Sequence, residues 1–156
     1  MRGRKDYNYY IFVDYSDKLI GYNIIKKKDI LLLLPKIAKL RHYRNLKHKR
    51  EYLRAMKKLF IREKIDSLIL RSKILQVRNN LDIFTEVLEF IKNNNDCIIF
   101  VSVDDFQFKH LKRLLNVVDG DNTDIIQESS LKKGTPEYKM SLIIDTKLNI
   151  KRRKEK

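Results

Sequence analysis

Two short runs of apolar, β-favouring residues constrain the fold of this chain more than any other feature. They span residues 9–13 and 97–103, and both are apolar along almost their whole length, as in strands covered on both faces of a sheet. Asp14 directly follows the first run, and Asp104 and Asp105 follow the second. We therefore expect an α/β fold in which both strands lie centrally. If they are parallel neighbours, their carboxyl ends and these acids meet at one crevice.

The rest of the chain is typical of a mixed sheet flanked by helices. A second strand is expected over residues 19–26, after a polar turn, and it should pair antiparallel with the first. Residues 67–77 fit a third strand, with a helix as the open alternative. Helices are expected over 81–92, 106–118 and 136–151, and a short strand over 123–127.

A basic segment interrupts this pattern. Residues 29–64 show helical spacing of apolar side chains, and residues 36–64 contain twelve Lys or Arg against two Glu. We interpret the segment as one or two basic helices inserted beside the main fold. The whole chain, residues 1–156, is expected to be a single domain. Residues 151–156 form a basic tail that should fray.

The charge of the chain indicates a polyanionic partner. Lys and Arg total 35 and Asp and Glu total 20, which gives a net charge of +15. Nucleic acid is the commonest such partner in a cell, and Tyr43 and Tyr52 could stack on bases. Backbone contacts alone would give little sequence specificity. A solvated helix face is the alternative explanation. The candidate phosphate-binding residues are Lys36, Lys39, Arg41, Arg44, Lys47, Lys49, Arg50, Arg54, Lys57 and Lys58.

Several classes of protein are excluded. The single Cys97 cannot form an intramolecular disulfide, and it makes no cysteine-based zinc site on its own. The longest apolar runs are far shorter than the about 18 residues of a membrane span. No signal peptide is visible, so we expect an intracellular, cytoplasmic protein. The sequence contains no phosphate-cradling glycine loop and no nucleophile elbow.

Further acids accompany the two acidic strand ends. Asp145 lies beside an apolar stripe of the last expected helix, where an unpartnered buried carboxylate would cost several kcal/mol. Asp82 and Glu86 are one turn apart on the helix that precedes the second buried strand. Each acid also has a structural explanation. Asp14 could begin a turn, Asp104 or Asp105 and Asp82 could cap helices, and Asp145 could pair with the basic insertion.

This order of elements and acids resembles the ribonuclease H-like fold. In that fold, acids lie on the first strand, the first core helix, the fourth strand and the last helix. Those places here hold Asp14 in IFVDYSDKLIGYNII, Asp82 or Glu86 in LDIFTEVLEF, Asp104 in CIIFVSVDDFQ and Asp145 in SLIIDTKLN. The chain is similar in particular to small archaeal and transposase-like members; compare ESSLKKGTPEYKMSLIID. It differs from ribonuclease H proper in lacking the glycine-rich turn after the first acid, in its large insertion and in placing Asp145 mid-helix.

The resemblance implies a nuclease or related phosphoryl-transfer enzyme with two Mg²⁺ or Mn²⁺ ions, because oxygen-only ligands favour these metals. Asp14 and Asp104 would be the central ligands, with Asp82 or Glu86 holding one ion and Asp145 the other. Two alternatives stay open. The chain could be a non-catalytic nucleic-acid binder of the same fold, or a structural or protein-interaction domain whose acids are caps and salt bridges.

Overall fold

The computed structural model describes residues 6–119 and 123–154 of the chain. These residues form a five-stranded sheet in the order β3-β2-β1-β4-β5. The strands are β1 (Tyr9–Ser16), β2 (Leu19–Lys26), β3 (Arg71–Gln76), β4 (Cys97–Val101) and β5 (Asp124–Gln127). The helices are α1 (Lys27–Leu33), α2 (Lys49–Arg62), α3 (Asn80–Asn93), α4 (Asp105–Asp119) and α5 (Pro136–Lys154). Short 3₁₀ turns are η1 (Leu34–Ile37), η2 (Tyr43–Asn45), η3 (Ile65–Leu68), η4 (Val77–Asn79) and η5 (Glu128–Ser130).

The pairing of the strands confirms the predicted mixed sheet. β1 pairs antiparallel with β2 and parallel with β4, so the two apolar runs are neighbours in the middle of the sheet. β4 in turn pairs parallel with β5, and β2 pairs antiparallel with β3. The carboxyl ends of β1, β4 and β5 therefore lie at one edge of the sheet.

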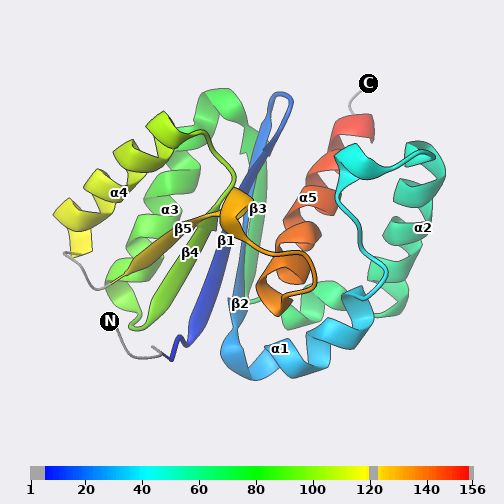
Figure 1. The fold of residues 1–156 in the computed structure, drawn as a ribbon, viewed down its shortest axis with the longest axis horizontal. Helices are drawn as coiled ribbons and strands as arrows, with labels where there is room; N and C mark the ends of the chain where they lie inside the picture. The colour runs from blue at the N-terminus through cyan, green and yellow to red at the C-terminus, as the bar shows by residue number, and fades with distance from the viewer. Residues whose placement is uncertain (1–5, 120–122, 155–156) are drawn as a thin grey trace.

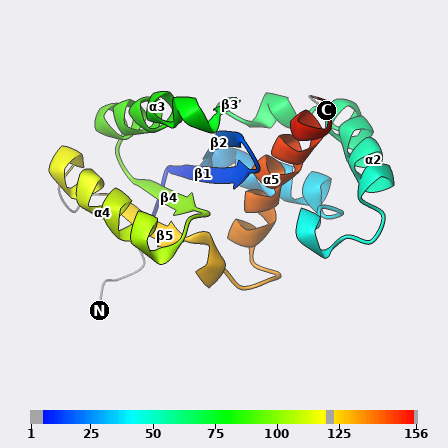
Figure 2. The same ribbon diagram turned by 90° about the horizontal axis from the view of Figure 1, so that it is seen from above.

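Helices cover both faces of the sheet (Figure 1). On one face, α3 packs against β2 and β3, and α4 packs against α3. On the other, α5 packs against β1 and β2, and α2 packs against α5 (Figure 2). The odd-numbered side chains of β1, such as Ile11 and Val13, join the α3 and α4 core, whereas Phe12 joins the α5 core. Among the described helices, none is long and apolar enough to cross a membrane.

The basic segment forms the layer outside α5. Residues 29–64 contain most of α1, the turns η1 and η2, and α2, which buries Leu53, Met56 and Phe60. The segment 67–77, left open between strand and helix, forms the end of η3 and then β3. The expectation that the tail frays is wrong for residues 151–154, which continue α5, while 155–156 lie outside the described residues.

A close approach between α5 and β2 sets the position of the last helix. Gly21 lies opposite Asp14 in the pairing of β1 with β2. A Cβ atom on Gly21 would lie 2.9 Å from Cδ1 of Ile144 and 3.1 Å from the carbonyl oxygen of Lys73. Because only glycine leaves this space, Ile144 packs directly on the backbone of β2. Its neighbour Asp145 is thereby brought to the sheet edge that holds Asp14.

Candidate functional site

Three polar side chains lie at or just beyond the carboxyl ends of the three parallel strands β1, β4 and β5. Successive residues of a strand point to opposite faces, and Phe12 of β1 and Phe100 of β4 point toward α5. Two residues further along the chain, Asp14 and Ser102 therefore face α5. Glu128 follows β5 in the same alternation, because Ile126 also packs in the α5 core. β1 thus brings the acid Asp14 to this edge, the chain after β4 brings the hydroxyl of Ser102, and the chain after β5 brings the second acid, Glu128.

Helix α5 presents a polar stripe to this edge. Ser141, Asp145 and Asn149 are four residues apart, so they share one face of the helix, and all three are buried. The Oγ of Ser16 donates to Oδ1 of Asn149 at 2.8 Å, which joins the stripe to the end of β1. Asn149 Nδ2 donates to the backbone oxygen of Asp145 at 2.8 Å. The stripe and the strand ends together make a buried polar centre inside an otherwise apolar layer.

Burial and neighbouring acids raise the pKa values of Asp14 and Glu128 in this centre. Only 4% of Asp14 is exposed. Burial, followed by the charges of Glu128 and Asp145, raises the pKa of Asp14 well above its ordinary value. Burial and the charge of Asp145 likewise raise the pKa of Glu128, although a hydrogen bond from Ser102 opposes this rise. The carboxylate cluster, which we define as Asp14, Glu128 and Asp145, therefore concentrates negative charge that the fold only partly offsets.

The η2 turn of the basic segment contacts Asp145. The backbone N–H of Tyr43 donates to Oδ2 of Asp145 at 3.0 Å, and Nε2 of His42 lies 3.9 Å from Oδ1. Burial raises the pKa of Asp145, while the charges of His42 and Arg44 and the Tyr43 hydrogen bond lower it. Burial lowers the pKa of His42, against the opposing effect of Asp145. The basic insertion is therefore a partner of Asp145, in agreement with the structural explanation of this acid from the sequence.

Asp104 lies outside this cluster, contrary to the expectation from sequence. Its side chain is exposed, and its Oδ1 accepts a hydrogen bond from the backbone N–H of Gln107 at 2.8 Å. This is the geometry of a helix N-cap, so Asp104 begins α4. Asp105 is exposed in the first turn of the same helix. β4 ends at Val101, and the residue that follows it toward α5 is Ser102.

The acids of α3 also lie apart from Asp145. Glu86 packs on the opposite face of the sheet, where its Oε2 lies 2.9 Å from Nζ of Lys73 and its Oε1 accepts from the hydroxyl of Tyr22. Asp82 is exposed in the first turn of α3. β3 runs parallel to β1 and ends shortly before α3, so the first turn of α3 begins near the sheet edge that holds Asp14. Glu86 thus takes a structural position, and Asn79 rather than Asp82 is the N-cap of α3.

Sequence reasoning missed Glu128. The signal was available in the short apolar run before it, because Ile125 and Ile126 mark a strand and Glu128 lies two residues beyond Ile126 on the same face. Placing it required knowing that β5 is parallel to β4 and adjacent to it.

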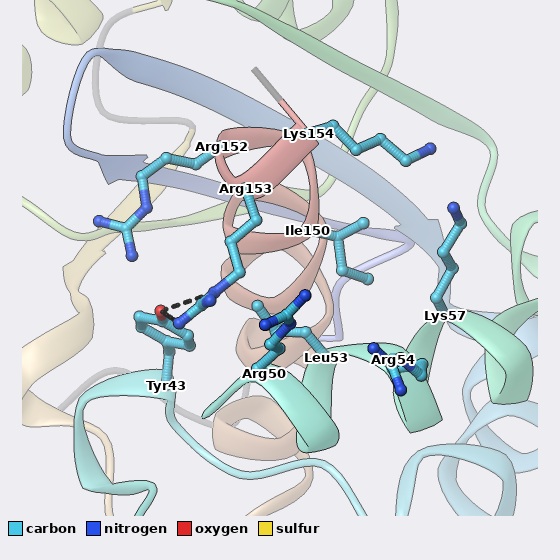
Figure 3. A pocket seen from close by; sticks show the side chains of 9 residues that line it. All are labelled: Tyr43, Arg50, Leu53, Arg54, Lys57, Ile150, Arg152, Arg153 and Lys154. Carbon is cyan, nitrogen blue, oxygen red and sulfur yellow. Dashed lines mark hydrogen bonds between the residues drawn. The ribbon is translucent and has the colours of Figure 1, made fainter. Parts of the chain in front are cut away.

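A basic groove is lined in part by Tyr43 (Figure 3), the residue whose backbone N–H contacts Asp145. It is a surface cavity of about 450 Å³ between α2 and α5. Among the described residues that line it, six are cationic and none is acidic. The lining residues are Tyr43, Arg50, Leu53, Arg54, Lys57, Ile150, Arg152, Arg153 and Lys154. Close like charges without an acid between them repel, so this groove favours an anion.

The groove uses only part of the predicted phosphate-binding set. Arg50, Arg54 and Lys57 line it, and Nζ of Lys49 lies 5.2 Å from the centre of the Tyr43 ring. Arg44 acts on the carboxylate cluster instead. Of the other predicted cations, Arg41, Lys47 and Lys58 are exposed outside the groove lining. The groove's remaining cations come from the end of α5, which was expected to fray.

The prediction that Tyr43 and Tyr52 stack on bases is not supported by their contacts. The ring of Tyr43 contacts groove cations, with Cζ of Arg152 5.1 Å from its centre. Tyr52 packs against the core, and its hydroxyl accepts from the backbone N–H of Arg41 at 2.7 Å. Both rings therefore serve internal contacts. The groove presents guanidinium and ammonium groups, which are common phosphate-binding groups.

The carboxylate cluster has the donor chemistry of a magnesium or manganese site. Its donors are oxygens, and their mutual repulsion would be relieved by a cation. In the described part of the chain, no three His, Cys, Asp or Glu side chains are grouped closely enough to hold a metal by themselves. Mg²⁺, however, is usually held by one or two carboxylates together with water and substrate phosphate. Asp14 together with Asp145 or Glu128 supplies the two carboxylates that such a site needs.

The sequence matches no family model and no curated protein. Among solved structures, the fold is similar to that of a chain in the PCNA:RNase HII complex from Archaeoglobus fulgidus, with a TM-score of 0.51 and 17% sequence identity. The likeness covers 94% of this chain and 73% of that chain. At this identity the comparison shows the fold, which is ribonuclease H-like: a mixed sheet with parallel and antiparallel strands, flanked by helices.

Proposed function

We propose that this protein binds nucleic acid along the basic groove and hydrolyses a phosphodiester bond at the carboxylate cluster with Mg²⁺ or Mn²⁺. One observation supports the proposal above the others. The buried acids and the six-cation groove adjoin each other at Tyr43, which donates to Asp145 and lines the groove. Acids for a metal and cations for a phosphate backbone are the two parts that such a reaction needs.

The residues would divide the work as follows. Asp14, with Asp145 or Glu128, would hold the metal, which when bound would activate water and stabilise the leaving oxygen. Water adds to phosphorus, and one ester bond breaks to leave a phosphate monoester and a hydroxyl. Arg44 lies close enough to Glu128 and Asp145 to lower the pKa of each, so it could also contact the reacting phosphate. Groove cations would hold the neighbouring phosphates and thereby orient the strand.

A second candidate function, a nucleic-acid binder without catalysis, is favoured by the end of β4. A hydroxyl, Ser102, occupies the position from which the resemblance implies an acid, and Asp104 caps α4 instead. A protein of this kind would keep the groove and its affinity for phosphates. It would lose only the chemistry at the sheet edge.

A cleavage assay separates these functions. Wild-type protein is incubated with labelled RNA, DNA and hybrid oligonucleotides in Mg²⁺, in Mn²⁺ and in chelator. We expect metal-dependent cleavage, and Asp14→Asn and Asp145→Asn should each reduce it by at least about 100-fold, because several kcal/mol of charge stabilisation is lost. Glu86→Gln, the same chemical change on the opposite face, should stay active. Binding without cleavage in any metal would leave the non-catalytic function.

Salt dependence tests the groove. The logarithm of the oligonucleotide affinity should fall linearly with the logarithm of salt concentration, and Arg50→Gln/Arg54→Gln should reduce the slope by about 1 to 2. The matched control is Lys109→Gln/Lys112→Gln on α4, which removes the same charge from exposed positions away from the groove. A flat dependence in the wild type would instead point to a structural or protein-interaction domain.

A further inference from the structure

We infer that Tyr43 is a positioning residue that couples occupation of the basic groove to the availability of Asp145 for a metal. This inference rests on the proposed function and adds to it an order of events: nucleic acid in the groove strengthens metal binding at the acids. Two contacts of Tyr43 support the inference. Its backbone N–H contacts Asp145 of the carboxylate cluster, and its side chain contacts Arg153 of the groove.

The backbone of Tyr43 occupies a carboxylate oxygen that a metal would need. Its N–H donates to Oδ2 of Asp145 at 3.0 Å, and Asp145 is only 5% exposed. The other oxygen, Oδ1, lies 3.9 Å from Nε2 of His42 and 3.5 Å from Nδ2 of Asn149. Both oxygens of Asp145 are thus engaged by the chain itself.

The side chain of Tyr43 is held by three cations, of which Arg152 and Arg153 line the groove (Figure 3) and Lys49 lies outside its lining. Its hydroxyl accepts hydrogen bonds from Nε and Nη2 of Arg153 at 3.3 and 3.0 Å. Arg152 and Lys49 lie 5.1 and 5.2 Å from the centre of its ring. Such cation–ring contacts and a phenol hydrogen bond fix the side chain, and with it the peptide that contacts Asp145.

A phosphate in the groove competes for the same cations. A guanidinium can form two parallel hydrogen bonds to an ionised phosphate, and both charges favour this contact, so Arg152 and Arg153 should turn from the neutral phenol of Tyr43 toward the bound anion. The peptide of Tyr43 is then free to move, and Oδ2 of Asp145 becomes available to the metal. Because coupling between two binding sites is reciprocal, the metal should equally strengthen nucleic-acid binding.

The test measures both affinities and their coupling. A phosphorothioate oligonucleotide, which keeps the backbone charge, is titrated with and without saturating Mn²⁺, and Mn²⁺ is titrated with and without the oligonucleotide. Metal bound by the oligonucleotide itself is subtracted with the Asp14→Asn protein. In the wild type we expect each ligand to tighten the other by at least about fivefold.

Tyr43→Phe keeps the ring and the peptide and removes only the acceptor for Arg153. We expect this variant to reduce the coupling factor to half or less. We also expect it to tighten Mn²⁺ binding by about threefold when no oligonucleotide is present, which is near the lower end of the contribution of one hydrogen bond. A merely structural role would weaken metal binding instead. Tyr43→Leu, which also removes the ring, should abolish the coupling. Tyr22→Phe is the matched control, because its hydroxyl bonds Glu86 on the opposite face.

The possible failures are distinguishable. If both ligands bind wild-type protein independently, the inference is wrong and the proposed function survives. If Tyr43→Phe retains the full coupling factor, the coupling comes from the electrostatic field alone, which also overturns the role of Tyr43. If Mn²⁺ binding does not depend on Asp14, or the oligonucleotide does not bind, the proposed function fails and the inference fails with it.

Discussion

The two faces of the sheet are built in contrasting ways. The face covered by α3 and α4 is an apolar core, and its charged Glu86 lies at the margin in an ion pair with Lys73. The face covered by α5 buries Asp14, Ser141, Asp145 and Asn149 among its apolar side chains. Buried carboxylates that repel one another oppose folding. The contrast teaches that the second face gives up some of the stability of its apolar core to hold a polar centre.

Opposite effects on stability should separate the faces most clearly. Ile99 is buried in β4 on the α3 and α4 face, and Ile99→Ala should lower the free energy of unfolding by about 2–5 kcal/mol. Asp14→Asn on the other face should raise it, because a buried charge that repels Glu128 and Asp145 is removed. Urea unfolding of the two variants measures both changes. A large loss of stability in Asp14→Asn would show that the acid is a structural partner instead.

The pH dependence of stability sharpens the same contrast. The pKa values of Asp14, Glu128 and Asp145 are raised in the folded state, chiefly by burial. Between the ordinary carboxyl pKa of about 4 and the raised values, the folded state binds more protons than the unfolded state. The contribution of these acids is therefore most favourable below pH of about 4 and is lost as pH rises through the raised pKa values.

Urea unfolding between pH 4 and 8 measures this contribution as a difference between two proteins. The free energy of unfolding of wild type should fall with rising pH relative to that of Asp14→Asn, in which one of the three acids cannot titrate. Parallel curves for the two proteins would show that Asp14 is not perturbed by its surroundings.

The smallest expected effect concerns Asp104, the N-cap of α4 on the first face. Asp104→Ala removes the N-cap of α4 and should cost about 1 kcal/mol of stability, whereas Asp104→Asn should retain the cap. Neither variant should change cleavage if the cap is its only role. Loss of cleavage in Asp104→Asn, with stability unchanged, would return Asp104 to the site.

Much of the fold could be predicted because its signals are local. The apolar runs of β1 and β4, the hairpin to β2 and the helical spacing of α3 and α4 depend on residues a few positions apart. Asp14 and Asp145 were found because both lie within strongly apolar segments. Asp104 was misjudged because β4 ends at Val101, so the chain has already left the sheet two residues before the acid.

The sequence by itself determined the element types, the α/β class and a large excess of positive charge, since these follow from short-range periodicity and composition. Only the tertiary structure decided which acids meet and where the cations gather. Gly21 and Ile144 bring α5 onto the sheet, so that Asp145 joins Asp14 and Glu128. The groove likewise requires α2 and the end of α5, far apart in the chain, to pack together. Such meetings depend on long-range packing, which no local pattern of residues encodes.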